Sequence, residues 1–430
     1  MKSNHFTIAL LTVVALMPSP ALAQANQTLT LRNAEQIALH NHPQIQAAAN
    51  IAAASEARVT QARSAYYPTV YGSATGAYAE NDSRIGAGAL NNPVIYDRFA
   101  EGITASQLVT DFGRTHELVK SSSLHAQAQQ ENVVTTRADV LLQVDQSYFA
   151  ALKAQAVLAV AQETVKARQL VSDQITELEK NKIKSGLDVS FANVDLAQAQ
   201  LLLIQAQNDL EASFAQLSDA LGYSDERTFV LSEEAIPSTP PAALTEIVQE
   251  ALRDRPELVG QRLDANAAHS YATAERDLWM PTISAVGTAG LIPVRQDSLS
   301  PRYAAAGFNV NIPLFNGHLF GALQTEAKEQ ADAQDQFVRN LQNHIVRDVR
   351  TAWLNANSGF QRLSVTQQLL TQANMALDLA QSRYKLGLSS IVELSQAQLN
   401  QTQAEIAQAS ARYDYEAQIS ALNYQMGALH

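Results

Sequence analysis

The sequence predicts a mainly α-helical fold with a small β part, in which one helix–strand–strand–helix plan is used twice. Residues 38–43 resemble residues 251–256, and Tyr67-Pro68 resembles Met280-Pro281, in both cases 213 residues later (256 − 43 and 281 − 68). Helix-favouring residues run for unusually long stretches, 318–384 and 391–426. Short runs with strand-like alternation lie between the repeated motifs and the long helices. These observations indicate a tandem duplication.

The duplication divides the chain into repeats. Later matches lie 205 residues apart, such as Leu221-Gly222 with Met426-Gly427 (426 − 221), so the first repeat carries eight more residues before Asp111 (213 − 205). We expect a leader at 1–23, a first repeat at 24–223, a linker at 224–243 and a second repeat at 244–430. Each repeat should begin with one helix, at 31–65 and at 244–278, that ends just before a proline.

Two strands are expected to follow in each repeat, at 69–78 and 99–109 and again at 283–292 and 303–312. Each run has about ten residues, which is the length that a tilted strand needs to cross a bilayer. Aromatic residues lie at or near the ends of these runs, where an aromatic girdle would sit. They are Tyr66, Tyr67, Tyr71, Tyr78, Trp279 and Tyr303. Two ordinary soluble hairpins are the alternative. If the strands do span a membrane, several chains must each contribute four, because four strands cannot close a barrel.

The rest of each repeat is expected to be a long helical hairpin, at 114–222 and 318–427. A helix over 318–384 would be about 100 Å long at 1.5 Å per residue, too long to be supported by one compact core. Narrow seams of small and apolar residues, for example Ile345, Val349, Ala352 and Ala356, favour coiled-coil contact along the rod.

Composition indicates an exported protein. An apolar run from 6 to 17 is followed by Ala21-Leu22-Ala23, which predicts a signal peptide cleaved near Ala23. A membrane anchor is the alternative, but the run is short for a spanning helix. No later window is expected to match a membrane helix in length and apolarity. The chain has no cysteine, and acidic residues outnumber basic ones, 42 to 30. No basic cluster occurs, so nucleic acid is not an expected partner.

Both hairpin tips carry the pattern Ser-x-x-acid. Gly387 can adopt the positive φ that ends a helix, and Ser390 with Glu393 forms a capping box for the next one. Ser185 and Asp188 stand 205 residues earlier (390 − 185 and 393 − 188). The acids are either helix caps or a ring of carboxylates around the narrow end of a tube, and one side chain can serve both roles.

No catalytic or metal-binding constellation is present in the sequence. A phosphate loop, zinc spacing and nucleophile elbow are all missing, so no cofactor, metal or catalytic residue is predicted. The one close histidine pair, His40 and His42, is replaced by Arg253 and Arg255 in the second repeat. A polar helix end before a proline explains both pairs better than metal binding.

The order of these elements resembles the TolC family of outer-membrane efflux proteins across essentially the whole mature chain. The resemblance rests on residues 38–43, 67–68, 108–114 (with Asp-Phe-Gly), 312–317 and 387–398, and on their double occurrence. It implies a homotrimer that forms a 12-stranded barrel in the outer membrane of a Gram-negative bacterium. The barrel would continue as a long α-helical tunnel through the periplasm.

The resemblance also assigns roles at the tips. Tyr384, Gly387 and Glu393 match positions for closure and docking in the second tip, and Asp188 matches the acidic position of the first. Gln396 stands where some members have a second acid, and Lys182 stands at the first tip's usual glycine position. The turn residues Lys182, Ser185, Gly387 and Ser390 are therefore the expected docking surface.

The predicted function is a passive exit duct of a tripartite efflux or type I secretion system. Its expected partners are further copies of itself, outer-membrane lipid, a periplasmic membrane-fusion adaptor and an inner-membrane pump. The pump would be of the resistance-nodulation-division or ATP-binding cassette type. A soluble periplasmic coiled-coil scaffold is the alternative, and a secreted enzyme is a distant third.

Overall fold

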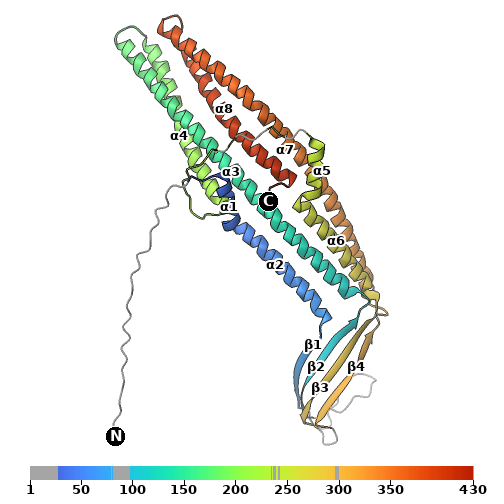
Figure 1. Ribbon diagram of the computed structural model, residues 1–430. Helices are drawn as coiled ribbons and strands as arrows, with labels where there is room; N and C mark the ends of the chain where they lie inside the picture. The colour runs from blue at the N-terminus through green and yellow to red at the C-terminus, as the bar shows by residue number, and fades with distance from the viewer. Residues whose placement is uncertain are drawn as a thin grey trace, which may run out of the picture.

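The computed structural model describes residues 28–78, 80, 97–233, 235, 239–240, 243–295 and 300–429. It is an elongated bundle of helices with one small antiparallel sheet at an end (Figure 1). The predicted mainly α fold with a small β part, and its twofold repetition, is confirmed. The expected leader, at 1–23, lies outside the described residues.

Each repeat contributes two short helices, two strands and two long helices. The first repeat has α1 (Leu31–Asn41), α2 (Pro43–Arg63), β1 (Thr69–Ala77), β2 (Arg98–Thr110), α3 (Arg114–Lys180) and α4 (Gly186–Ala220). The second has α5 (Leu244–Asp254), α6 (Pro256–Arg276), β3 (Thr282–Val294), β4 (Arg302–Asn311), α7 (Leu319–Lys385) and α8 (Ile391–Met426). A 3₁₀ turn, Ser64–Tyr66 or Asp277–Trp279, precedes the first strand of each repeat.

The expectation of a single helix at the start of each repeat is wrong. His42 and Arg255 have extended backbone conformations, with ψ of 123° and 119°, and each separates two helices. The cause is the proline that follows, because its ring disfavours helical conformation in the preceding residue. His42 also caps α2, since its Nδ1 accepts a hydrogen bond from the Gln44 N–H at 3.3 Å. This role accounts for His42 without a metal.

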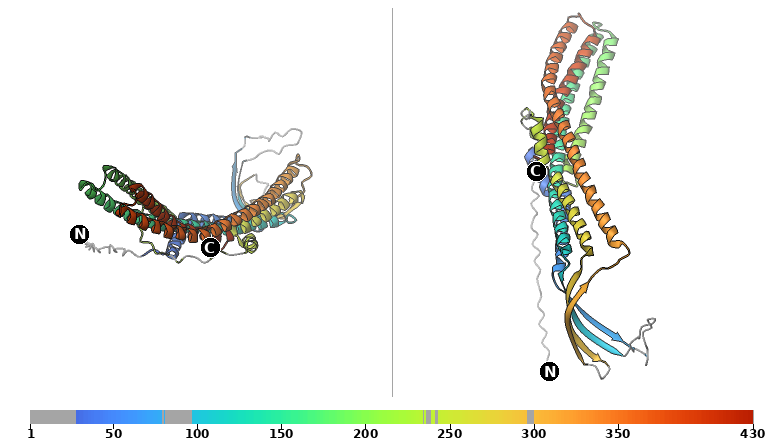
Figure 2. Two further views of the ribbon diagram at one scale, coloured as in Figure 1. Left: turned by 90° about the horizontal axis from the view of Figure 1, so that it is seen from above. Right: turned by 90° about the vertical axis from the view of Figure 1, so that its right-hand side faces the viewer.

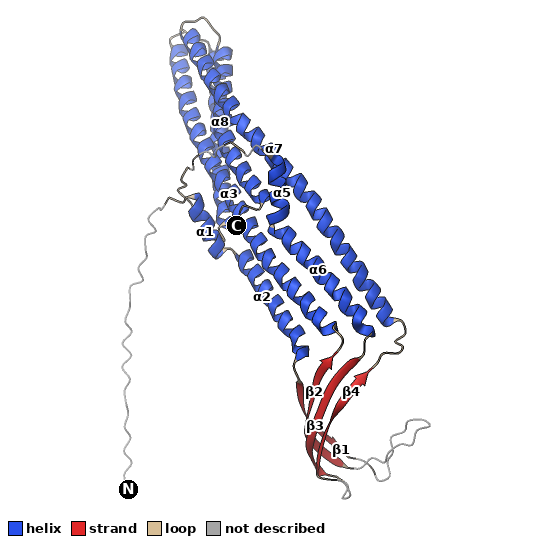
Figure 3. Ribbon diagram, turned by 45° about the vertical axis from the view of Figure 1, so that its right-hand side comes forward, coloured by secondary structure: helices blue, strands red, loops and turns tan. Residues whose placement is uncertain are grey.

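The four strands form one curved sheet in the order β1-β2-β3-β4 (Figure 3). All neighbours are antiparallel, and β2 with β3 joins the two repeats. Among the described residues, the outer strands β1 and β4 each have a neighbour on one side only. This part of the chain therefore leaves the sheet with two open edges.

The helices form a single curved layer, seen as an arc from above in Figure 2. Near the sheet its order is α2, α3, α6, α7, and near the tips it is α4, α3, α8, α7. The helices α3 and α7, of 67 residues each, run along the whole layer. The layer thus has α2 and α4 along one edge and α7 along the other.

The largest apolar cluster lies at the waist, where α1 and the linker cross α3, α4 and α8. Val144, Tyr148 and Leu217 are completely buried there. The Tyr148 hydroxyl donates to the carbonyl oxygens of Leu29 at 2.8 Å and Ser232 at 2.7 Å. A smaller cluster around Ile345 and Val349 repeats the arrangement in the second half. The waist holds the start of the chain and the linker against the long helices.

One helix corrects the expectation that no later segment matches a membrane helix. Among the described residues, α4 is long and apolar enough by composition to cross a bilayer, yet only 11% of its most apolar window is buried. The continuous run from Leu201 to Ile204 explains the high hydropathy. Because α4 forms an edge of the layer, its exposed apolar side chains, such as Leu187 and Leu201, lack a neighbouring helix among the described residues of a single chain.

Both hairpins turn through the same Schellman motif. In the first tip, the N–H of Ile183 donates to Leu178 at 2.9 Å and that of Lys182 to Glu179 at 2.7 Å. In the second tip, Leu388 and Gly387 make the equivalent bonds. Lys182, with φ of 58°, adopts the left-handed conformation that Gly387 adopts with φ of 74°. A lysine there costs about 1 kcal/mol more than a glycine.

Gly387→Ala is expected to lower the free energy of unfolding by about 1 kcal/mol, because alanine is strained at positive φ. Gly186→Ala is the matched control. Both glycines have open space around the position of an added Cβ, but Gly186 has no positive φ. Thermal unfolding of the purified variants measures the difference. Equal melting temperatures for the two variants would contradict the assignment of strain to the Gly387 backbone.

Candidate functional site: the hairpin tips and the sheet

The two tips lie side by side at the end of the bundle opposite the sheet (Figure 1). An apolar cluster joins them, with Ile175 from α3, Ala192 from α4, Tyr384 from α7 and Ile391 and Leu394 from α8. All five side chains are at least nine-tenths buried. A change in the position of one hairpin therefore disturbs the packing of the other.

Asp188 is held in place by its own helix. Its Oδ2 accepts hydrogen bonds from the Ser185 N–H at 3.0 Å and the Ser185 hydroxyl at 2.7 Å, while Ser185 Oγ caps the Asp188 N–H at 3.2 Å. This is a complete capping box. The bonds from Ser185 lower the pKa of Asp188 below its ordinary value of 3.8. The carboxylate is thus charged and fixed in direction at neutral pH.

The capping box predicted for Ser390 and Glu393 is incomplete, because the Glu393 carboxylate does not return to the Ser390 backbone. Ser390 Oγ accepts from the Glu393 N–H at 3.4 Å, but the Glu393 carboxylate pairs with Arg383 Nε at 3.2 Å. Both partners are about half exposed. The pair ties the end of α7 to the start of α8, so the second tip is closed by an ion pair as well as a cap.

Tyr384 reaches from α7 to the first tip. Its ring lies under the ammonium of Lys184, with Nζ 3.8 Å from the ring centre. Burial, followed by the nearby negative charge of Asp188, raises the pKa of Tyr384 to about 12. The buried hydroxyl makes no hydrogen bond to another described residue. The phenol is therefore protonated at neutral pH, and its negative neighbour is Asp188. Tyr384 and Asp188 are the two predicted tip residues that the fold brings together from different hairpins.

The other predicted tip residues lie at the surface. Among the described residues, they form no hydrogen bond or ion pair with the opposite hairpin. Gln396 is exposed and donates to Asn400 one turn along α8, at 2.9 Å. Lys182 and Gly387 shape the turns, as described above. Sequence reasoning missed the roles of Lys184 and Arg383. For Lys184, the available signal was the lysine at every second position from 180 to 184.

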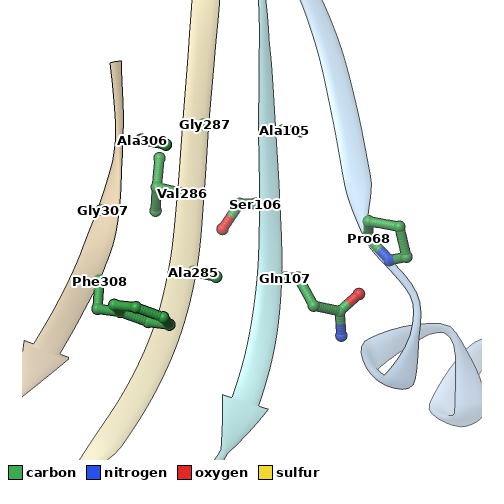
Figure 4. Close-up of a pocket in the computed structure, with 10 residues that line it drawn as sticks. All are labelled: Pro68, Ala105, Ser106, Gln107, Ala285, Val286, Gly287, Ala306, Gly307 and Phe308. Carbon is green, nitrogen blue, oxygen red and sulfur yellow. The ribbon is translucent and has the colours of Figure 1, made fainter.

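The sheet has one apolar and one polar face. Strand register places Val70, Ala105, Gly287 and Ala306 in one row across the sheet and Gln107, Ala285 and Phe308 in the next row on that face. The opposite face carries Thr104 and Thr288, whose hydroxyls are 3.3 Å apart, and Asn309 and Asn311. Figure 4 shows the apolar face, where a shallow hollow of about 440 Å³ lies beside Ala285 and Phe308.

The six predicted interface aromatics do not all share a face. Tyr66, Tyr67 and Trp279 lie at the helix-side end of the sheet and are exposed, and Tyr78 is exposed just beyond β1. Tyr71 and Tyr303 differ, because the register places them on the polar face. Tyr303 covers Gly102 and Gly290 there, where a Cβ would collide with its ring. Its role in the structure is to pack over these glycines.

The described residues include no group of three or more His, Cys, Asp or Glu side chains that could hold a metal ion.

Solved structures with the same fold include CusC, with a TM-score of 0.81 and 19% identity over 92% of each chain. The Campylobacter jejuni CmeC outer membrane channel aligns with a TM-score of 0.80 and 19% identity, covering 93% of this chain and 85% of the other. The TolC-like fold class is thereby confirmed.

Related sequences include the outer membrane protein TolC of Vibrio cholerae, 24% identical over 432 residues, which covers 97% of this chain and 95% of the relative. The cation efflux system protein CusC of Escherichia coli K12 is 24% identical over 365 residues, covering 79% and 75%. A model of the family described as outer membrane efflux protein matches residues 34–223 and 247–428, which is most of the chain. The chain therefore belongs to the outer membrane efflux protein family.

Proposed function

We propose that three copies of this chain form the outer-membrane exit channel of a tripartite efflux or secretion system. The observation that carries the proposal is the four-stranded sheet, with its apolar face, its polar face and its two open edges. In a bilayer the edge N–H and C=O groups must be paired, so β1 of one copy would pair with β4 of the next. Three copies supply 12 strands, which leave room for a passage lined by the polar face.

The helical layer supports closure at the same edges. On α4, the exposed side chains of Leu187, Val194 and Leu201 recur every seven residues. On α7, Val365 and Leu379 are exposed two heptads apart. Such stripes pack into coiled-coil seams when a partner helix is available. The edge helices of neighbouring copies are that partner, which extends the barrel as a helical tunnel.

The tips are proposed to be the closed end of this tunnel. The apolar cluster that includes Tyr384 holds the hairpins of one chain together beside Asp188, and three copies would place several carboxylates around a narrow opening. Exposed Ile183, Leu386 and Leu388 beside Lys182 and Lys385 offer an apolar surface with a basic rim to a periplasmic adaptor. Substrates handed over by an inner-membrane pump would pass without chemical change. A soluble scaffold would leave the apolar sheet face in water, so we do not favour it.

The protein-only mass of the detergent-extracted mature protein, from light scattering with the detergent subtracted, is expected to equal three chains. Leu201→Asp is expected to reduce the trimer fraction, because a charge would enter the seam between α4 and α7. Leu170→Asp is the control, since this exposed residue lies on α3, inside the layer. A detergent-free soluble species would overturn the channel proposal.

Asp188→Asn combined with Tyr384→Phe is expected to raise the ion conductance of the resting channel in a planar bilayer, because the contact between the hairpins loses its charge and its hydroxyl. Gln396→Ala is the control and should leave conductance unchanged. Conductance equal to the parent in the double variant would limit Asp188 to its capping role.

Glu393→Ala combined with Asp188→Ala is expected to weaken cation preference, because both acids leave the constriction. The reversal potential in a salt gradient measures this preference.

The pH dependence of the resting conductance follows from the lowered pKa of Asp188. The stabilising effect of the Asp188 carboxylate is complete above the ordinary value of 3.8 and is lost as the pH falls through the lowered value. Resting conductance should thus be constant from about pH 5 to 8. A rise within that range would contradict control by Asp188.

A further inference from the structure

A buried cation lies in the seam between the two hairpins, on the side of the tips that faces the sheet. The Arg168 side chain of α3 is only 7% exposed. Its Nη2 donates to the Gln398 carbonyl oxygen at 2.8 Å and to Thr402 Oγ1 at 3.1 Å, both on α8. A buried guanidinium is costly unless its partners are in place, so these bonds hold α3 and α8 in one register.

Acidic residues complete the arrangement. Asp195 of α4 accepts a hydrogen bond from the Ser395 hydroxyl of α8 at 2.5 Å. Burial lowers the pKa of Arg168, and the charges of Asp195 and Glu405 raise it. We call Arg168, Asp195, Ser395 and Thr402 the clasp. It links three helices around a cavity of about 240 Å³.

The clasp lies nearer to the sheet than the tip contacts do. Thr402 lies 11 residues after the start of α8 at Ile391 (402 − 391), or about 16 Å along the helix axis. The apolar tip cluster with Tyr384 lies between the clasp and the turns. The tip cluster and the clasp are therefore separate contacts between the hairpins, and the clasp is the one farther from the opening. Nearer the sheet, α3 and α8 are also linked by the more exposed pair of Lys153 and Asp414.

The duplication shows that the clasp belongs to one seam only. At the offset of 205 residues, Arg168 corresponds to Ala373 on α7 and Thr402 to Ala197 on α4. Asp195 and Glu405 correspond to the uncharged Asn400 and Gln200. In the proposed trimer, α7 and α4 of adjacent copies form the seam equivalent to that of α3 and α8. The charged group that fastens the seam within a chain is thus absent, by sequence, from the seam between copies.

Resting on the proposed function, we infer that the clasp is a pivot, which keeps the two hairpins of one chain in register and confines the movement of α7 and α8 to the segment between Thr402 and the tip. Between the clasp and the sheet, each chain moves as one unit. Adjustment during opening then takes place at the seams between copies, where the positions equivalent to Arg168 and Thr402 are alanines and supply no polar bond.

Distances between spin labels test the pivot, because the chain has no cysteine and accepts engineered pairs. Glu177→Cys with Val392→Cys, the lower pair, reports on α3 and α8 on the tip side of the clasp. Ala159→Cys with Gln408→Cys, the upper pair, reports on the sheet side, nine residues from Arg168 (168 − 159) and six from Thr402 (408 − 402). Each pair is measured by double electron–electron resonance in the resting trimer and in the tip-opened variant with Asp188→Asn and Tyr384→Phe.

With an intact clasp, opening the tip should shift the lower pair and leave the upper pair unchanged. With Arg168→Met, which keeps the volume and removes the charge, the upper pair should shift and broaden as well. Lys153→Met is the control, because it removes a solvated ion pair of 2.8 Å between α3 and α8, and it should leave the upper pair fixed. An upper pair that moves with the clasp intact, or that stays fixed in Arg168→Met, would overturn the inference.

Thr402→Ala guards against a failure of Arg168→Met to assemble. It removes one acceptor and introduces the residue found at the equivalent position of the other seam, so a smaller shift in the same direction is expected. No shift at all in an assembled Thr402→Ala trimer, with Arg168→Met unassembled, would also count against the pivot. Conductance of the tip-opened variant tests the proposed channel separately, since the label distances do not depend on ion flow.

Discussion

A sheet with two open edges cannot stay alone in a bilayer, because lipid offers no partner for its exposed N–H and C=O groups. This constraint extends through the whole chain. The sheet and the helices form one continuous layer, with β1, α2 and α4 along one side and β4 and α7 along the other. In the proposed trimer, closing the sheet into a barrel would therefore bring the helical edges together as well. One requirement, satisfied in the membrane part, would then determine how the whole tunnel assembles.

The length of the layer creates a second requirement, since helices of about 100 Å cannot all share one core. Stability is instead distributed along the axis, with a waist cluster around Tyr148, a cluster around Val349 and a tip cluster around Ile391. Between them the seams are built from small residues, which let helices approach closely but hold few large contacts. Specific polar bonds, such as those of Arg168, fix the register that a seam of alanines leaves free.

Sequence reasoning succeeded where the determinant is local or periodic. The duplication, the strand alternation around Phe308 and the caps at Ser185 and Ser390 could all be read from short stretches. It failed for the two helix breaks, although Pro43 and Pro256 were visible, because the restriction acts on the residue before the proline. It did not find Arg168 with Thr402, since 234 residues separate the partners and no local pattern links them. Lys182 shows that a turn can force an unfavourable backbone on a lysine.

The two tips have diverged in a way that gives them different tasks. Asp188 is fixed by both bonds from Ser185, so it presents its charge to Tyr384 in one direction regardless of what the second hairpin does. Glu393 instead shares its charge with Arg383, and the half-exposed pair can rearrange at little cost. In the proposed channel, the first tip would therefore be a rigid docking point, and the second the adaptable element that binds to it or leaves it. A displacement of Tyr384 would disturb the shared apolar cluster but would leave the bonds between Ser185 and Asp188 in place, so opening could be reversible without local unfolding of the first turn.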